Sequence, residues 1–351
     1  MIVTFAWPSS HWRAGGVTAL YCFANGLARR GHEVHFVHGP AWPDLITSMD
    51  QLAWFPFDAR VRHHILPDFD EASLPHADIV FAPDMPGDAL PCIFIQGFRM
   101  LPLELERRAF TTPCPKVCIA SWLVGVGRDF GVPEEQLWHV PMGLDHELFS
   151  VRVPPDDRRY DVGLWHNPHP SKGGSTGWRA LVEAQRRRPD LRAVIFSATP
   201  LPDGLARQAD ALPWVDVRLG LDQQGLADQV FNQTRIFLQS SVHEGFGYTA
   251  VEAMACGAAL VSTDNGGSRD YAIHEETAIV VPPMDIEGLA AGIVELMSDD
   301  GGRARLAAAG ERHVRRFDWD LGAEILEGHL ERYLADPEAF RAPSADLTEA
   351  Q

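Results

Sequence analysis

The sequence predicts an α/β protein with two parallel-sheet domains in series. Short apolar runs alternate with helical stretches from one end of the chain to the other, as in folds whose helices cover a parallel sheet. Most of these runs are continuously apolar, as strands buried on both faces are. The length of 351 residues is roughly twice a common domain size.

The first half begins with a βαβ unit. Between the first two runs lies GVTALYCFANGLARRG, in which Val17, Leu20 and Ala24 share one helix face and Gly31 supplies a stop. Strand, glycine turn, helix and strand make a βαβ unit. The strands that we expect in this half are 2–7, 33–39, 77–82, 91–96 and 116–121.

The second half repeats this scheme. Strands are expected at 161–166, 191–197, 215–220, 235–240 and 258–263. Helices are expected near 175–187, 222–231, 248–256, 286–298, 302–316 and 320–334. The join near 141–158 is rich in proline and charge and has no apolar period. The tail from about Ala342 also lacks a period, so we expect it to be disordered.

Composition excludes several classes of function. The formal net charge of −18 repels phosphate backbones and anionic headgroups, so nucleic acid is not an expected partner. No run of about 18 apolar residues is present, so we expect no transmembrane segment. The N-terminus has no basic region before its short apolar run, which predicts a first strand and not a signal peptide.

The cysteines favour a reducing compartment. There are five, and most lie among apolar residues: Cys22, Cys92, Cys114, Cys118 and Cys256. Cys114 and Cys118 are four apart, but no second Cys or His pair completes a zinc site. We therefore expect buried thiols in a cytoplasmic protein, with no metal.

The segment HEGFGYTAVEAMACG follows the strand expected at 235–240. Ligands of parallel sheets bind beyond the carboxyl ends of the strands, which is where Glu244 stands. Gly245 and Gly247 allow close approach of the backbone to a ligand. The helix expected to start near Tyr248 offers free N–H groups to an anion. Glu252 lies about one turn into that helix.

This spacing suits a nucleotide diphosphate sugar. A carboxylate accepts two hydrogen bonds from a ribose cis-diol, so Glu252 is expected at the ribose. The diphosphate is expected at the turn and helix start, and the sugar at Glu244. The donor-binding residues of this turn are Gly245, Phe246, Gly247, Tyr248 and Thr249. A surface loop followed by an ordinary amphipathic helix is the alternative.

EGFGYTAVE resembles the E-x7-E signature of retaining glycosyltransferases with the GT-B fold, in particular glycosyltransferase family 4 (glycosyl transferases group 1). The continuation AMACGAALVSTDNGGSRDYAI is similar to that family's small-residue run, strand and glycine pair. HVPMGLDHELF, GHEVHFV and FDWDLGAEILEGHLERYL are also typical of it. The resemblance covers about residues 1–335 and is strongest over 137–283.

The resemblance implies two Rossmann-like domains facing a cleft, with a C-terminal helix that crosses back to the first domain. It implies an acceptor-binding domain at 1–146, a nucleotide-sugar-binding domain at 147–325, a returning helix at 326–340 and a tail at 341–351. It also implies transfer of a sugar to an acceptor hydroxyl with retention of anomeric configuration. The donor is a substrate, and neither a metal nor another cofactor is usually required.

Lys172 and His166 are the expected partners of the diphosphate. The family pattern after the first strand of the second domain is a Gly-Arg pair and then Lys-Gly, and DVGLWHNPHPSKGG matches at Lys172-Gly173. Lys172 is one of only 2 lysines in the chain, although a chance surface lysine is the alternative. His166 stands where the family often has Arg, so the catalytic candidates are Glu244, Lys172 and His166. His166 and His169 as a metal pair would lack a third ligand.

Gly15, Gly16 and Gln96 are the site residues expected in the first domain. Gly15-Gly16 opens the first helix, and the family uses this turn near the diphosphate or acceptor; a plain tight turn is the alternative. We assign Gly16 to the donor and Gly15 to the acceptor side. Gln96 ends a predicted strand where many members have His, and an amide cannot act as a base. No G-x-G-x-x-G fingerprint is present, which disfavours a dinucleotide.

The acceptor is expected to be a small soluble molecule or a glycan. Residues 1–150 carry 17 acidic and 10 basic residues, so the domain has no overall basic attraction to membranes. Two other functions stay open. Glu244 and Glu252 could be the carboxylate pair of a glycoside hydrolase, although Lys172 would then have no role. A non-catalytic sugar-nucleotide-binding protein would bind donor without turnover.

Overall fold

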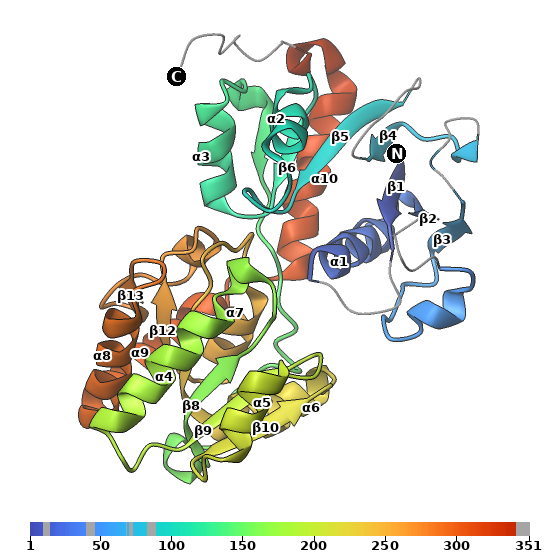
Figure 1. The fold of residues 1–351 in the computed structure, drawn as a ribbon. Helices are drawn as coiled ribbons and strands as arrows, with labels where there is room; N and C mark the ends of the chain where they lie inside the picture. The colour runs from blue at the N-terminus through green and yellow to red at the C-terminus, as the bar shows by residue number, and fades with distance from the viewer. Residues whose placement is uncertain (10–14, 40–45, 68, 70–72, 83–88, 342–351) are drawn as a thin grey trace. The chain divides into compact units, whose positions relative to one another are not determined.

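The structure is a computed structural model, and it describes residues 1–9, 15–39, 46–67, 69, 73–82 and 89–341. The chain divides into two compact units (Figure 1), Met1–Gly143 with Phe317–Gln351, and Leu144–Arg316. The sequence placed these boundaries after residues 146 and 325. Apart from Arg341, the tail expected at 341–351 lies outside the described residues.

The first unit is built on a seven-stranded parallel sheet with the order β3-β2-β1-β4-β5-β6-β7. Its strands are β1 Ile2–Pro8, β2 Glu33–Gly39, β3 Val61–Ile65, β4 Ile79–Phe81, β5 Leu90–Ile95, β6 Lys116–Cys118 and β7 Leu137–His139. The five strands predicted for this half correspond to β1, β2, β4, β5 and β6. The run at 116–121 is cut short because a helix begins at Ser121.

Four α-helices of the first unit are α1 Gly15–Arg29, α2 Leu103–Thr111, α3 Ser121–Asp129 and α10 Trp319–Ala335. The C-terminal helix α10 lies beside α1 within this unit (Figure 1). A Cβ on Gly26 would stand 2.5 Å from Cβ of Ala323, so the two helices approach as closely as glycine permits. The prediction that the last helix packs on the first domain is thus confirmed.

The second unit is built on a six-stranded parallel sheet with the order β10-β9-β8-β11-β12-β13. Its strands are β8 Tyr160–Trp165, β9 Ala193–Ser197, β10 Val215–Leu219, β11 Thr234–Gln239, β12 Ala259–Thr263 and β13 Ala278–Val281. Its helices are α4 Gly174–Arg187, α5 Asp203–Asp210, α6 Gln223–Gln229, α7 Tyr248–Ala255, α8 Ile286–Ser298 and α9 Asp300–Val314. The predicted two-sheet α/β architecture is therefore confirmed.

The core of the second unit fixes the positions of the loops that follow its strands. Leu181 of α4 and Ile293 of α8 belong to one buried cluster with Ile195 of the sheet. Burial of such side chains anchors both helices to the sheet. Because β8 and β11 are neighbours, with Leu164 opposite Leu238, the loops that follow them leave the sheet side by side. None of the described helices is long and apolar enough to cross a membrane.

Candidate functional site

The loops after β8 and β11 are fastened to each other. The Ser240 hydroxyl donates to the Gly173 carbonyl at 3.0 Å, and the Val242 N–H donates to the Ser171 carbonyl at 2.7 Å. Gly173 has φ 61°, and a Cβ on it would lie 1.9 Å from the carbonyl oxygen of Ser240. Only glycine fits this position, because it tolerates positive φ and carries no side chain.

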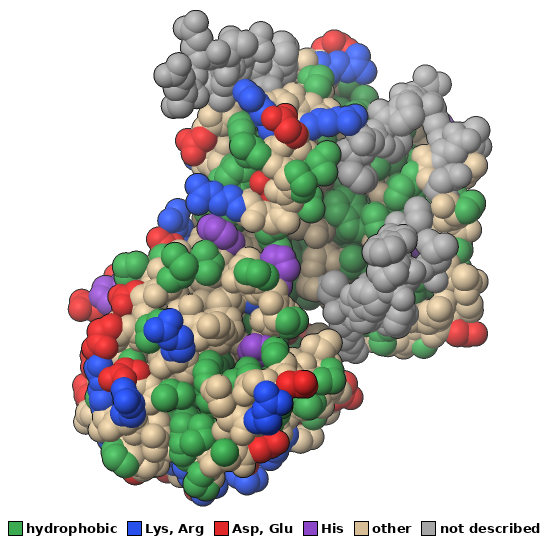
Figure 2. All heavy atoms as spheres, in the orientation of Figure 1, with side chains coloured by type: hydrophobic (Ala, Val, Ile, Leu, Met, Phe, Trp, Pro, Cys, Tyr) green, Lys and Arg blue, Asp and Glu red, His purple; other side chains and the backbone are tan. Residues whose placement is uncertain are grey.

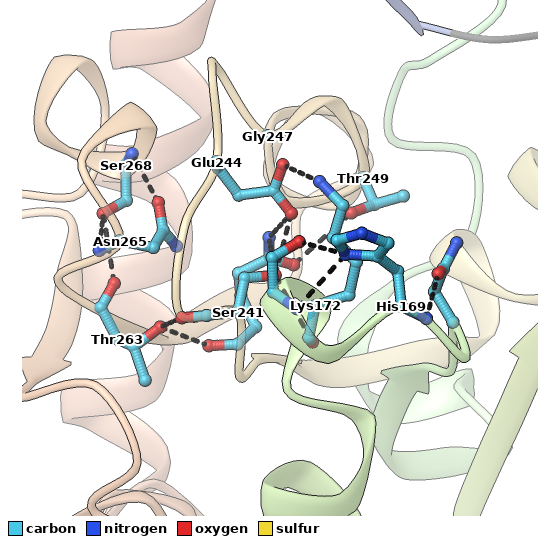
Figure 3. Close-up of polar contacts among 12 residues, drawn as sticks. His169, Lys172, Ser241, Glu244, Gly247, Thr249, Thr263, Asn265 and Ser268 are labelled. Carbon is cyan, nitrogen blue, oxygen red and sulfur yellow. Dashed lines mark hydrogen bonds and ion pairs between the residues drawn. The ribbon is translucent and has the colours of Figure 1, made fainter. Parts of the chain in front are cut away.

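This contact brings Lys172 and Glu244 together in a mostly buried ion pair. Lys172 Nζ lies 2.8 Å from Glu244 Oε2, and the two side chains are 15% and 7% exposed (Figure 3). The Ser241 hydroxyl donates to the other oxygen of Glu244 at 2.8 Å. Lys172 Nζ also lies 5.9 Å from the ring centre of Trp165. A buried carboxylate of this kind depends on its cation and hydroxyl partners.

Gln239 connects this pair to the start of α7. Its Nε2 lies 3.4 Å from Glu244 Oε1, and its Oε1 accepts from the Thr249 hydroxyl at 3.4 Å. Sequence reasoning missed Gln239 and Ser241, because it treated the end of this strand only as buried structure. The available signal was the position of polar residues at the carboxyl end of an apolar strand.

A third loop, after β12, holds the backbone of Glu244. The Glu244 N–H donates to the Asn265 carbonyl at 2.9 Å, and the Gly267 N–H donates to the Glu244 carbonyl at 3.1 Å. A Cβ on Gly267 would lie 2.6 Å from the carbonyl oxygen of Phe246, so glycine is required there. Ser268 and Asn265 fix the loop through a hydrogen bond of 2.9 Å from the Ser268 N–H to Asn265 Oδ1 (Figure 3). Asn265 and Ser268 were not among the predicted site residues.

Helix α7 begins at Tyr248, as the sequence predicts. Gly247 precedes it as the N-cap residue with φ 98° and, being glycine, contributes no side-chain cap. A Cβ on Gly247 would lie 2.3 Å from the Tyr271 hydroxyl, which donates to the Gly247 carbonyl at 3.3 Å. The turn made of Gly245, Phe246 and Gly247 therefore leads into α7 through an N-cap residue without a side chain, and a helix start of this kind suits an anion.

Glu252 lies in α7, eight positions after Glu244, and is 8% exposed. Burial, with a smaller contribution from Glu252, raises the pKa of the Cys256 thiol to about 12. Glu252 is therefore close enough to the Cys256 thiol to influence its pKa. Its role at a ribose stays a prediction.

His166 directly follows β8 and is 7% exposed. Neither ring nitrogen has a hydrogen-bond partner among the described residues, and both are shielded from solvent. A Cβ on Gly174, at the start of α4, would lie 2.8 Å from His166 Nδ1. Burial lowers the pKa of His166, which keeps the ring neutral near pH 7. Contact with a phosphate would therefore require the loop to move, and the ring would act as a neutral donor.

His169 has a local structural role. Its Nδ1 lies 2.7 Å from the Ser171 hydroxyl and accepts from the Ser171 N–H at 3.3 Å, at the start of the short helix Pro170–Lys172. Within the described parts of the chain, no group of three or more His, Cys, Asp or Glu side chains could hold a metal ion. The structure thus gives His169 a partner that needs no metal.

In the first unit the structure brings Gly16 and Gln96 together. Gln96 Nε2 donates to the Gly16 carbonyl at 3.0 Å, and a Cβ on Gly16 would lie 2.0 Å from Gln96 Oε1. Gly15 is the first residue of α1, as predicted. The assignment of Gly15 and Gln96 to the acceptor and of Gly16 to the donor stays a prediction.

Comparison with known protein families finds a match within the second unit. Residues 169–313, which include Lys172, Glu244, Glu252 and the Asn265–Ser268 loop, match the family described as glycosyl transferases group 1. This part of the chain is therefore similar to that family. The group 1 segment therefore spans all the second-unit candidates except His166, which lies just before it.

Curated relatives of the group 1 family match the chain over part of their length. One is D-inositol 3-phosphate glycosyltransferase from Xylanimonas cellulosilytica, 30% identical over 217 residues, covering 57% of this chain and 52% of the relative. Another is GDP-mannose-dependent alpha-(1-6)-phosphatidylinositol monomannoside mannosyltransferase from Mycolicibacterium smegmatis, 29% identical, covering 57% and 58%. The matches therefore span about half the length of the curated relatives.

Solved structures show the same fold over almost the whole chain. Sucrose-phosphate synthase from Thermosynechococcus elongatus has a TM-score of 0.74 at 18% identity, covering 96% of this chain and 100% of its own. HepE from Anabaena, solved with UDP and glucose, has a TM-score of 0.70 at 15% identity, covering 95% and 100%. At such identities the likeness concerns the fold, and it confirms the predicted GT-B class.

Proposed function

We propose that this protein moves a sugar from a nucleotide diphosphate sugar to an acceptor hydroxyl, with retention of anomeric configuration. The observation that supports this most is the buried ion pair of Lys172 and Glu244, which Gln239 connects to the start of α7. The match of residues 169–313 to the group 1 family supports the proposal independently. A cytoplasmic location is part of the same proposal, in keeping with five free cysteines.

The donor would be bound by its diphosphate. Lys172 and the N–H groups at Tyr248–Thr249 would face the phosphates, Glu252 the ribose and Glu244 the sugar. The ion pair adds a step that the sequence did not suggest. As a phosphate approaches Lys172, the ammonium would be shared, and one oxygen of Glu244 would become able to accept from a sugar hydroxyl.

The chemistry would be dissociation of the diphosphate from the anomeric carbon with attack by the acceptor on the same face. The carbon–oxygen bond to the diphosphate breaks, the bond to the acceptor oxygen forms, and the acceptor proton passes to a departing phosphate oxygen. Lys172, the start of α7 and a repositioned His166 would stabilise the charge that develops. Preorganised donors of this kind contribute roughly 3 kcal/mol each. Gln96 would orient the acceptor beside Gly15, and neither a metal nor a protein base is needed.

The first test is a panel of nucleotide diphosphate sugars screened by thermal shift and then by transfer assays. A bound donor at about 100 times its dissociation constant should add about 2.7 kcal/mol to the stability of the protein. Lys172→Ala should weaken binding of every nucleoside diphosphate. Arg187→Ala is the matched control, since it removes an exposed ion pair with Glu287 in the same unit. NMR of the product should show the anomeric configuration of the donor.

Each outcome bears on a separate part of the proposal. Binding that is equal in the Lys172→Ala and Arg187→Ala variants would remove Lys172 from the donor site. An inverted product would contradict retention. Tight donor binding with no transfer to any acceptor would indicate the non-catalytic alternative, and release of sugar from a glycoside without nucleotide would indicate the hydrolase.

A further inference from the structure

A polar residue ends the apolar strand that leads into the candidate site. Gln239 is the last residue of β11 and is 1% exposed. Its backbone is held independently of its side chain, because the Gln239 carbonyl accepts from the Thr263 hydroxyl at 3.4 Å and Gln239 pairs with Ser262 in the sheet. A buried amide destabilises the fold unless it is hydrogen-bonded. The contacts of the amide therefore need an explanation beyond the position of the strand.

The Gln239 amide, the Ser241 hydroxyl and one oxygen of Glu244 form a closed ring of hydrogen bonds. Gln239 Nε2 lies 3.3 Å from Ser241 Oγ and 3.4 Å from Glu244 Oε1, and the Ser241 hydroxyl donates to the same oxygen at 2.8 Å. An amide nitrogen carries two protons and a hydroxyl carries one, so the ring uses all three protons. Glu244 Oε1 accepts two of them, and its direction is therefore fixed from two sides.

The other end of the amide fixes its orientation. Gln239 Oε1 accepts from the hydroxyl of Thr249, in the first turn of α7, at 3.4 Å. A flipped amide would place its oxygen against the Glu244 carboxylate with no proton between them, so one orientation satisfies both ends. Gln239 thus lies between the predicted sugar contact, Glu244, and the predicted diphosphate contact at the start of α7.

The two oxygens of Glu244 have different partners. Oε2 lies 2.8 Å from Lys172 Nζ, whereas Gln239 and Ser241 hold Oε1. A phosphate that shares Lys172 leaves Oε2 open to a sugar hydroxyl. A carboxylate held by its cation alone would then be free to rotate, but the two hydrogen bonds to Oε1 prevent this. Oε2 is therefore the oxygen that meets the sugar, and it does so in one direction.

Surface charges of the same unit are not held in this way. Figure 2 shows acidic and basic side chains side by side on the surface of the second unit. Arg187 and Glu287 are an exposed pair of this unit, with side chains 34% and 70% exposed. Exposed pairs contribute little and hold neither side chain in one geometry. The enclosed ring around Glu244 is therefore suited to recognition, and balancing charge does not require it.

We propose that Gln239 is a positioning residue that determines which sugar the site accepts. By holding Oε1 of Glu244, it directs Oε2 to one hydroxyl position of the sugar. A sugar that lacks this hydroxyl leaves a buried carboxylate oxygen without a donor and binds more weakly. The inference rests on the proposed function, which places the sugar at Glu244. Gln239 acts through Glu244 and touches neither the sugar nor the phosphates.

The test is calorimetric titration of the full chain with UDP, GDP, UDP-glucose, GDP-mannose and the analogues of both sugars that lack one hydroxyl each. In the unchanged protein, loss of one particular hydroxyl should weaken binding at least about tenfold. Gln239→Leu keeps the size of the side chain without its hydrogen bonds. It should reduce that loss to about threefold or less, while affinity for the nucleoside diphosphate stays within about twofold.

Gln239→Glu adds a readout that a structural role would not change. At about pH 7.5 the introduced carboxyl is ionised and cannot donate to Glu244, so the preference for the hydroxyl should be lost. At about pH 5.5 two neighbouring carboxyl groups share a proton, which can replace the amide proton, so the preference should return. The preference of the unchanged protein should be similar at both pH values.

Gln233→Leu is the matched control, because this glutamine is half-buried just before the other end of the same strand. It should bind every ligand like the unchanged protein. If the unchanged protein binds neither UDP nor GDP, the proposed function fails. If it binds one of them, the inference alone is overturned by equal binding of all the analogues, by a full preference in Gln239→Leu, or by no return of the preference in Gln239→Glu at the lower pH.

Discussion

Two buried glutamates, one in each unit, have the same exposure and opposite kinds of partner. Glu106 and Glu244 are each 6% exposed. Glu106 accepts from three consecutive backbone N–H groups, whereas Glu244 accepts from the side chains of Lys172, Ser241 and Gln239. Backbone donors cannot leave without refolding the loop, but side chains can rotate. The first arrangement fixes a surface, and the second leaves a charge that a substrate can rearrange.

Breaking the side-chain arrangement should have the largest effect. Lys172→Met leaves the Glu244 carboxylate buried without its cation, so the free energy of unfolding should fall by about 3 kcal/mol. Sugar transfer should fall at least about 100-fold with it. Adding Glu244→Gln should restore most of the stability but none of the activity. Urea unfolding and initial rates of the single and double variants measure both.

The exposed pair of Arg187 and Glu287, 2.6 Å apart with side chains 34% and 70% exposed, is the control for this cycle. Replacing both by alanine should leave the free energy of unfolding almost unchanged, because exposed ion pairs contribute little. Recovery of transfer in the Lys172→Met, Glu244→Gln double variant would mean that the pair is structural, like Glu106.

Breaking the backbone arrangement should affect stability alone. Glu106→Gln removes the charge that accepts three N–H groups, and the free energy of unfolding should fall by about 2 kcal/mol. Transfer to a water-soluble acceptor should stay within about twofold. Glu104→Gln, on the exposed side of α2, should leave stability unchanged. A large loss of transfer at normal stability in Glu106→Gln would show that this carboxylate also serves the reaction.

A buried histidine of the first unit, His38, should give the smallest effect on stability. His38 is 1% exposed, and its ring lies 2.9 Å from the Ser9 hydroxyl and 3.0 Å from the ring of His63. Burial first, then His63 and His64, lower its pKa to about 3. Near pH 6.5 the unfolded chain binds a proton at this histidine, whereas the folded chain does not. The free energy of unfolding therefore falls as the pH drops from about 6.5 toward 3.

For one such histidine the loss should be about 1 kcal/mol between pH 6.5 and 5.5, and no loss from this group is expected above pH 7.5. Urea unfolding of the full chain at pH 7.5, 6.5 and 5.5 measures this loss in the free energy of unfolding. His38→Gln, which keeps hydrogen-bonding capacity, should flatten the dependence by up to one proton. An unchanged slope in that variant would assign the acid sensitivity to other groups.

Much of the fold could be predicted from local pattern. The apolar runs gave ten strands, because a strand covered on both faces must be apolar along its length. Strands β3, β7 and β13 were missed. VRHHI of β3 carries polar residues. Strands β7 and β13 have only three and four residues, whereas the equally short β4 and β6 lie within the longer apolar runs predicted at 77–82 and 116–121. Helices α2, α3 and α5, of eight or nine residues, were also missed, although α6 and α7, which are no longer, were predicted.

By itself, the sequence determined the α/β class, the start of α7 at Tyr248 and the residue types of the candidate site, because glycine, charge and apolar period act through near neighbours. Only the tertiary structure decided that Lys172 is paired with Glu244, 72 positions away, and that Asn265 holds the same turn. These contacts depend on strand order, which places the ends of β8, β11 and β12 together. Local pattern carries no record of which distant loops become neighbours.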